Sequence, residues 1–464
     1  MITRVAGSFR DPSGFVFRHD DIICRTVMPS YKVHYDRLMD SNLHRVLVEK
    51  GLIVPHEEVT LDLPETTGAY KVIQPRKIPF ISFPYEWCFS QLKDAALLTL
   101  RIQKLALKKG MILKDASAYN VQFMDGKPVF IDTLSFESHE EESPWIAYRQ
   151  FCQHFLAPLC LMAHVDIRLN ALLRPQIDGV PLDLASRLLP ASTWMRFGIL
   201  THIHLHARST ARHATGEASA GLARKAKVSA AGMTGLIDSL KNTVSSLQYR
   251  PTGTEWADYY DHTNYSNEAA SVKGQIVRAW LERLRPKTAW DLGANTGVYS
   301  DIAAKAGAHT VAADIDPAAV ERHYRHLKER GQTQVLPLLQ SLENPSPGLG
   351  WAHAERPSFS DRGPCDVVMA LALVHHLAIS NHVPLPDLGA WFATLGRHLI
   401  IEFVPRTDSQ VVRMLAMRED SFPDYTLDGF EAAMKTRFEQ IDRTPIEGSE
   451  RMMYLFKSRQ FDSV

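Results

Sequence analysis

The chain has 464 residues, of which 45% are hydrophobic and 22% are charged. This composition is typical of folded globular proteins, and the length allows two or three domains, so a wholly disordered chain is excluded. The 52 basic and 52 acidic side chains give a formal net charge of zero, which removes the global electrostatic argument for a nucleic-acid or membrane-surface binder. A small-molecule or glycan partner is favoured over nucleic acid.

The cysteines and the apolar stretches indicate in which cellular compartment the protein is expected. The five cysteines are scattered and show neither zinc-site nor redox spacing, so we expect reduced thiols. The most apolar stretch, residues 151–165, is short and is interrupted by His154, Pro158 and His164. It is therefore not expected to span a membrane, and the N-terminus lacks the apolar core of a signal peptide. We expect a cytoplasmic protein.

The first 205 residues predict an α+β domain. Residues 15–17 and 22–27 indicate a β-hairpin, and residues 90–109 have apolar side chains at helical spacing before Gly110. Two further strand-like runs, 121–124 and 128–131, are separated by an Asp-Gly pair that is typical of a tight hairpin turn. Residues 145–206 predict helices. The Ala-, Arg- and Ser-rich region that follows predicts a helical connector over residues 206–250.

From residue 251 to the C-terminus, strand-like and helical runs alternate, which predicts an open, mostly parallel α/β sheet. Two last runs, 437–443 and 451–456, predict an antiparallel hairpin that closes one edge of a seven-stranded, Rossmann-like sheet. The five earlier strands are expected at residues 288–292, 310–313, 334–339, 366–371 and 398–403.

The first of these strands leads into a glycine-containing turn that opens a helix. The turn reads Asp291-x-Gly293-x-x-x-Gly297, and about twenty residues later a second apolar strand ends at Asp314. Glycine lets the backbone turn tightly and approach a ligand, and an acid at the second position can accept hydrogen bonds from ribose hydroxyls. The spacing differs from the Gly-x-Gly-x-x-Gly of a dinucleotide site.

This pattern, continued by Ala313-Asp314-Ile315-Asp316-Pro317, resembles that of class I S-adenosylmethionine-dependent methyltransferases. The resemblance implies S-adenosyl-L-methionine as the cofactor. By that resemblance, Gly293 and Gly297 approach its methionine part, Asp291 holds its amino group, Asp314 binds the ribose and Ile315 packs near the adenine. The cofactor-binding residues are expected to be Asp291, Gly293, Asn295, Gly297, Asp314 and Ile315.

The fourth strand is followed by His375 and His376, and Glu402 ends the fifth. Carboxyl ends of parallel strands border the ligand in such sheets, so one histidine paired with Glu402 would make a catalytic base. The alternative is that the histidines only cap and pack the loop. No metal site is expected, because the sequence lacks the Glu-x-x-Glu-His cluster of metal-dependent RNA ribose methyltransferases. Upstream, the aromatic segment 256–265 would either cap the cofactor or pack as a helix.

In the N-terminal half, Asp115, Asn120 and Asp132 surround a predicted hairpin. Their spacing resembles the catalytic loop of protein-kinase-like folds, in which the first acid is the base and the other two residues hold magnesium on ATP. The chain departs from that pattern in having Lys114 in place of an arginine, and Asp-Thr-Leu in place of Asp-Phe-Gly. Lys71 is the candidate for a phosphate-binding lysine.

Over its whole length the chain also resembles bacterial methyltransferase-like proteins that include the host-specific nodulation type. The favoured interpretation is a methyltransferase that acts on an oxygen or nitrogen acceptor and carries an N-terminal kinase-like domain. One alternative is a bifunctional kinase and methyltransferase that modifies a glycan or glycolipid. Another is that the N-terminal half is a non-catalytic module that recognises a partner.

Overall fold

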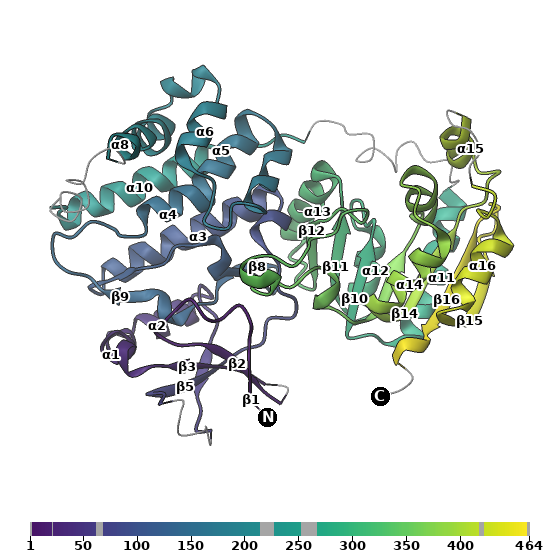
Figure 1. Cartoon of the computed structure of the whole chain (residues 1–464), viewed down its shortest axis with the longest axis horizontal. Coiled ribbons are helices and arrows are strands. Elements are labelled where there is room, and N and C mark those ends of the chain that lie inside the picture. The colour runs from purple at the N-terminus through teal and green to yellow at the C-terminus, as the bar shows by residue number, and fades with distance from the viewer. Residues whose placement is uncertain are drawn as a thin grey trace. The chain divides into compact units, whose positions relative to one another are not determined.

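The computed structural model of the chain describes residues 2–20, 22–61, 68–213, 227–251, 267–416 and 422–461. The chain forms two compact units (Figure 1). Unit 1 comprises Met1–Arg250 together with Leu349–Arg356, and unit 2 comprises Pro251–Gly348 and Pro357–Val464. The aromatic segment 256–265 lies outside the described residues. No helix in the described ranges is long and apolar enough to cross a membrane.

Unit 1 begins with a five-stranded antiparallel sheet in the order β1-β2-β3-β5-β4. The predicted first hairpin is confirmed, with Val16 opposite Arg25 in the β2–β3 register. Two short helices, α1 and α2, lie between β3 and β4 in the chain. The strands and helices of this part are β1 (Ile2–Arg4), β2 (Val16–His19), β3 (Ile22–Val27), α1 (Lys32–Asp40), α2 (Leu43–Glu49), β4 (His56–Glu58) and β5 (Lys71–Pro75).

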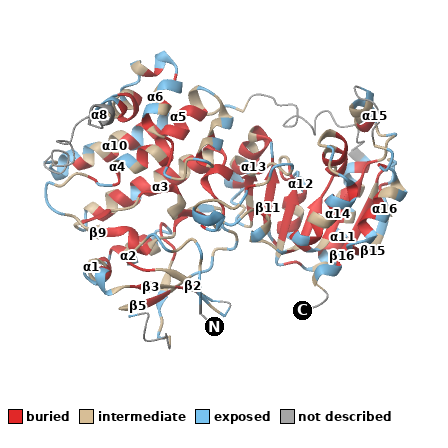
Figure 2. Ribbon diagram, in the orientation of Figure 1, coloured by how far each residue is buried: buried red, intermediate tan, exposed pale blue. Residues whose placement is uncertain are grey.

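The rest of unit 1 is mainly helical and is built around α3, which buries one long face (Figure 2). The Cys88 backbone N–H donates to Gln91 Oε1 at 2.9 Å, which caps the start of α3. At the other end Gly110 has φ +68°, a conformation that favours glycine after a helix. The helices are α3 (Phe89–Leu107), α4 (Tyr148–Phe151), α5 (Ala157–His164), α6 (Leu182–Leu188), α7 (Phe197–Ile199), α8 (His206–His213) and α10 (Ala230–Ser246).

The expected separate connector over residues 206–250 is corrected by the structure, because α8 and α10 belong to unit 1. Helix α10 packs along α3. Lys104 pairs with Asp238 at 2.6 Å, and Lys93 Nζ donates to the Leu247 carbonyl at 2.7 Å. The buried face of α10 includes Met233 and Leu240. The apolar residues of α10 therefore form the face that packs on α3.

Two short antiparallel pairs follow α3, namely β6 (Met111–Leu113) with β9 (Phe136–Ser138), and β7 (Val121–Met124) with β8 (Lys127–Phe130). The predicted β7–β8 hairpin is confirmed, and Asp125 and Gly126 at its turn have φ +52° and +72°. Because β6 pairs with β9, the loops that carry Asp115 and Asp132 lie close together.

Unit 2 contains the predicted seven-stranded sheet, in the order β12-β11-β10-β13-β14-β16-β15. The first five strands are parallel, and the predicted last hairpin pairs antiparallel with them. Counted along the chain, the five parallel strands follow the doubly wound order 3-2-1-4-5. The strands are β10 (Thr288–Leu292), β11 (His309–Asp314), β12 (Val335–Leu339), β13 (Cys365–Ala370), β14 (Gly396–Phe403), β15 (Phe438–Pro445) and β16 (Met452–Ser458).

Helices cover the sheet, whose strands are largely buried (Figure 2). One core cluster joins Trp280 and Leu281 of α11 and Tyr299 of α12 to Val367 of β13 and Ile400 of β14. Helices α14 and α16 pack together and against β14 and β15 respectively. The helices of unit 2 are α11 (Asn267–Leu284), α12 (Val298–Lys305), α13 (Pro317–Arg330), α14 (Leu385–Leu395), α15 (Ser409–Ala416) and α16 (Leu427–Lys435).

One segment between β12 and β13 corrects the expected boundary at residue 251. The peptide Leu349–Arg356 belongs to unit 1, although both of its flanks belong to unit 2. Hydrogen bonds at 3.0 and 3.1 Å between the Leu349 and Arg356 backbones close it into a small loop. The packing of this peptide on unit 1 could not be predicted from the sequence, because the segment shows no apolar periodicity of a helix or a strand.

Candidate functional site

The predicted glycine turn joins β10 to α12 and requires glycine at two positions. Gly293 and Gly297 have φ +77° and +85°, a region that other residues avoid. The backbone N–H of Gly293 donates to the Ala313 carbonyl at 2.9 Å, which holds the turn against the next strand. A Cβ on Gly297 would lie 2.0 Å from the His323 ring, so no side chain fits there.

Two carboxylates, Asp291 and Asp314, lie at this end of the sheet and are almost completely buried. Asp314 accepts hydrogen bonds from the backbone N–H groups of Asn295 at 2.7 Å and Asp316 at 2.8 Å. Asp291 accepts one from Ser300 Oγ at 2.6 Å. Burial raises the pKa of each carboxyl to about 6. Both remain mainly ionised at neutral pH and create a negative site beside the glycine turn.

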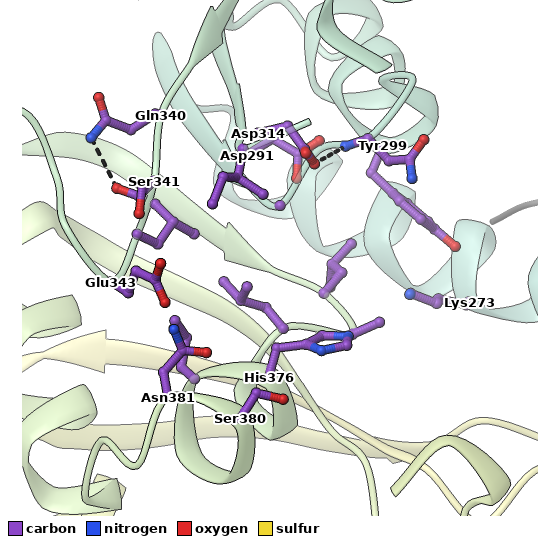
Figure 3. A pocket seen from close by; sticks show the side chains of 18 of the residues that line it. Lys273, Asp291, Tyr299, Asp314, Gln340, Ser341, Glu343, His376, Ser380 and Asn381 are labelled. Carbon is purple, nitrogen blue, oxygen red and sulfur yellow. Dashed lines mark hydrogen bonds between the residues drawn. The ribbon is translucent and has the colours of Figure 1, made fainter. Parts of the chain in front are cut away.

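A cavity of about 310 Å³ opens beside the two acids at the carboxyl edge of the sheet. Asp291 and Asp314 lie on one side of it, and His376, Ser380 and Asn381 lie on the opposite side (Figure 3). Five of the six predicted cofactor residues line the cavity, and Gly297 supports it from the start of α12. The lining residues predicted from the sequence are Asp291, Gly293, Asn295, Asp314, Ile315 and His376.

The structure distinguishes the two adjacent histidines. His376 lines the cavity, whereas His375 is completely buried, and among the described residues neither of its ring nitrogens has a hydrogen-bond partner. Burial, together with the charge of Arg451, lowers the pKa of His376 to about 4. His376 is therefore a neutral imidazole at pH 7 on the wall of the cavity, and its lowered pKa makes it a weak base. One histidine, His375 or His376, was expected to pair with Glu402, and for His375 this hydrogen bond is not formed.

Glu402 is instead the centre of a buried ion-pair network. Its carboxylate pairs with Lys273 at 2.6 Å and Arg451 at 3.1 Å, and it accepts a hydrogen bond from the Ala372 backbone N–H at 2.8 Å. Ala372 has φ +51°, so Glu402 holds a strained loop that lines the cavity. Lys273 and Ala372 both line the cavity. Glu402 therefore connects the wall formed by α11 to the wall formed by the loop after β13.

Sequence reasoning missed several lining residues. Residues 340–343 follow β12, and the rule that ligands lie at carboxyl ends of strands would have found them. Lys273 and Tyr299 come from α11 and α12, and the Lys273 Nζ lies 4.6 Å from the centre of the Tyr299 ring. Burial lowers the pKa of Lys273, and Glu402 opposes that shift. No sequence motif marks this lysine.

In unit 1 the fold brings Asp115, Asn120 and Asp132 to one place, where protein donors already occupy the two acids. Asp115 accepts hydrogen bonds from the Ser117 backbone at 2.9 Å and Gln150 Nε2 at 2.8 Å. Asp132 accepts from the Leu134 backbone at 2.9 Å and Ser135 Oγ at 2.7 Å. The same Ser135 Oγ accepts from Asn120 Nδ2 at 3.2 Å.

The structure does not support Lys71 as the phosphate-binding residue. Lys71 lies on β5 and pairs with Glu58. The cation that contacts Asp132 is Arg25 of β3, at 2.6 Å, and Arg25 also pairs with Asp11 at 3.0 Å. Within the described ranges, no group of three or more His, Cys, Asp or Glu side chains is placed to hold a metal ion.

Comparison with known proteins gives one relative over the full length. No protein-family model matches the chain. Nodulation protein NoeA of Rhizobium meliloti (strain 1021) is 36% identical over 463 residues, which cover 98% of this chain and 96% of that protein.

Several solved structures are also similar. The magnesium protoporphyrin IX methyltransferase ChlM of Synechocystis PCC 6803, with bound SAH, is 19% identical and covers 44% of this chain and 92% of its own, with a TM-score of 0.32. The bifunctional kinase-methyltransferase WbdD is 16% identical over 46% of this chain and 45% of its own, with a TM-score of 0.31. At 36% identity over nearly the full length of both proteins, the chain belongs to the family of nodulation protein NoeA.

Proposed function

We propose that unit 2 is an S-adenosylmethionine-dependent methyltransferase that acts on an oxygen or nitrogen acceptor. The observation that carries the proposal is one cavity at the carboxyl edge of the sheet, where the glycine turn, Asp291 and Asp314 meet. A seven-stranded sheet with this strand order supports it. A cofactor with a ribose, an amino group and an apolar base matches two buried acids and the exposed apolar side chain of Ile315.

Three of the predicted residues would contact this cofactor through their side chains. Asp314 would accept hydrogen bonds from the ribose hydroxyls, and Asp291 would hold the amino group. Ile315 would pack on the adenine. The cofactor supplies a sulfonium methyl group that is already electrophilic, so the protein's part is to hold the acceptor in line and exclude water.

His376 is the residue we assign as the base, because it lies on the cavity wall opposite the two acids, where an acceptor would meet the methyl group. It would accept the proton that an acceptor hydroxyl or amine loses on methylation. Replacing it by glutamine is expected to lower methyl transfer by roughly 10²–10⁴-fold, while the affinity for the cofactor changes little.

The assay follows tritium from methyl-labelled S-adenosylmethionine into glycan and lipid fractions of cells that lack the gene. His382→Asn is the matched control, because His382 is an exposed histidine at φ +57°, a conformation that asparagine tolerates. Equal loss of cofactor affinity and transfer in His376→Gln would make His376 a structural residue. No transfer by the unaltered protein into any fraction would count against a methyltransferase.

For unit 1, the proposal is a kinase-like accessory module that does not transfer phosphate. The support comes from Asp132, whose carboxylate is occupied by Arg25 and Ser135 where a kinase would hold magnesium. Calorimetric titration of the whole protein with ATP and magnesium is therefore expected to give no binding. Binding that disappears in Asp132→Ala would establish the bifunctional alternative instead.

A further inference from the structure

The peptide Leu349–Arg356 is anchored to the rest of unit 1 by an ion pair from Glu355 to Arg10 and by the contact of Arg356 with Tyr119, and bonds within the peptide order the Glu355 carboxylate. The Glu355 side chain is 1% exposed and pairs with Arg10 at 2.6 Å and Arg356 at 3.1 Å. It also accepts a hydrogen bond from the Trp351 backbone N–H at 2.9 Å. A Cβ on Gly7 would lie 2.4 Å from the Glu355 carbonyl oxygen, so only glycine fits against the peptide.

The peptide contacts both parts of the kinase-like site. The Arg356 guanidinium lies 3.8 Å from the centre of the ring of Tyr119, which stands between Asp115 and Asn120 in the chain. Arg10 belongs to the β1–β2 loop, residues 5–15, where a kinase carries its phosphate-binding loop. The peptide therefore joins that loop to the loop of Asp115.

Ion pairs and a hydrogen bond continue from the β1–β2 loop toward the predicted kinase residues. Asp11 pairs with Arg25, which pairs with Asp132. Lys114 Nζ donates to Ser13 Oγ at 2.9 Å. Three side chains of the β1–β2 loop, Arg10, Asp11 and Ser13, thus bond to other parts of unit 1. The bond of Arg10 is made to Glu355 of the peptide.

The same chain connection also carries a wall of the unit 2 cavity. Residues 340–343 line that cavity and precede Leu349 by only a few residues. A ligand that orders residues 340–343 restricts the conformations of the peptide that follows, and coupling of this kind must act equally in both directions.

We infer that Leu349–Arg356 is a built-in clamp on the β1–β2 loop of unit 1, and that filling the methyl-donor cavity tightens it. This inference rests on the proposed function of that cavity. The conformational freedom of the β1–β2 loop would then depend on whether the methyl-donor cavity is occupied.

Hydrogen exchange of the full-length protein, measured by mass spectrometry with and without S-adenosylhomocysteine, tests the coupling. Peptides that cover residues 5–15 are expected to exchange roughly fivefold more slowly when the ligand is bound. Glu355→Gln is expected to remove this protection while calorimetry still shows binding. Asp238→Asn, which alters a more exposed ion pair of unit 1, should keep it.

Two results would overturn the inference, and they differ from each other. Ligand binding by calorimetry with unchanged exchange over residues 5–15 would show that the clamp is not coupled, and would leave the methyltransferase proposal intact. Absence of S-adenosylhomocysteine binding would remove the cofactor proposal and the coupling together.

Discussion

Replacing Asp314 by alanine is expected to weaken the binding of S-adenosylmethionine by at least about 100-fold in isothermal titration. Hydrogen bonds to a charged acceptor contribute about 1.5–3 kcal/mol each, and Asp314 would accept from two ribose hydroxyls. A loss of about 3 kcal/mol corresponds to roughly 100-fold in affinity. The buried acid also orders the turn through Asn295, which adds to the loss.

Because Asp314 also holds the backbone, a second variant separates binding from folding. Ile315 is 56% exposed, so Ile315→Glu should leave the fold intact while placing a charge where the adenine would pack. We expect it to lower the affinity about tenfold. Asp301→Asn on α12 is the control, because Asp301 pairs only with the largely exposed Arg330, at 3.4 Å, among the described contacts. Unchanged affinity in both Asp314→Ala and Ile315→Glu would contradict the assignment of the site.

Gly297→Ala is expected to be among the most destabilising single substitutions in unit 2. The new Cβ would overlap the buried His323 ring, and the backbone would stay at φ +85°. Overpacking and a left-handed backbone together cost about 3–5 kcal/mol, which lowers the unfolding midpoint of a unit of this size by roughly 6–20 °C. Differential scanning calorimetry measures this shift.

Gly331→Ala is the matched control. Gly331 has a positive φ of +64° at the end of α13, but no atom lies within 4 Å of an added Cβ. Its cost is expected to be only about 1 kcal/mol. Adding His323→Ala to Gly297→Ala should restore part of the stability, since it removes the overlapping ring. Equal effects of Gly297→Ala and Gly331→Ala would show that the overlap with His323 does not matter.

Unit 2 could be predicted in detail because its signals are local. The strand ending at Leu292, the turn at Gly293 and the acid that ends β11 follow one another within a short stretch of chain. The alternation of apolar runs then fixes which ends of the strands share an edge. The same locality explains the correct hairpins at Asp125 and in β15–β16, where turn residues and strand length suffice.

The partners of buried charges could not be predicted, because they come from distant segments. The ion-pair partners of Glu402 were not predicted: α11 supplies Lys273, and the turn before β16 supplies Arg451. Arg25 on β3 was not recognised as the partner of Asp132 for the same reason. Sequence alone also gave equal standing to His375 and His376, which only the packing of the loop separates.

The boundary of unit 1 was missed for a related reason. The Ala-rich composition after residue 206 is equally typical of an exposed connector and of a helix such as α10, which packs on α3 through Met233 and Leu240. Contacts at a sequence separation of several hundred residues, such as that between Arg10 and Glu355, have no local pattern at all.

The most direct test of the central claim is a crystal structure of the full-length protein grown with S-adenosylhomocysteine. The proposal predicts the ligand in the cavity of unit 2, with its ribose hydroxyls on Asp314, its amino group beside Asp291 and its adenine against Ile315. His376 should face the sulfur from the opposite wall. A ligand bound elsewhere, or a cavity that stays empty at saturating concentration, would contradict the assignment of this cavity as a methyl-donor site.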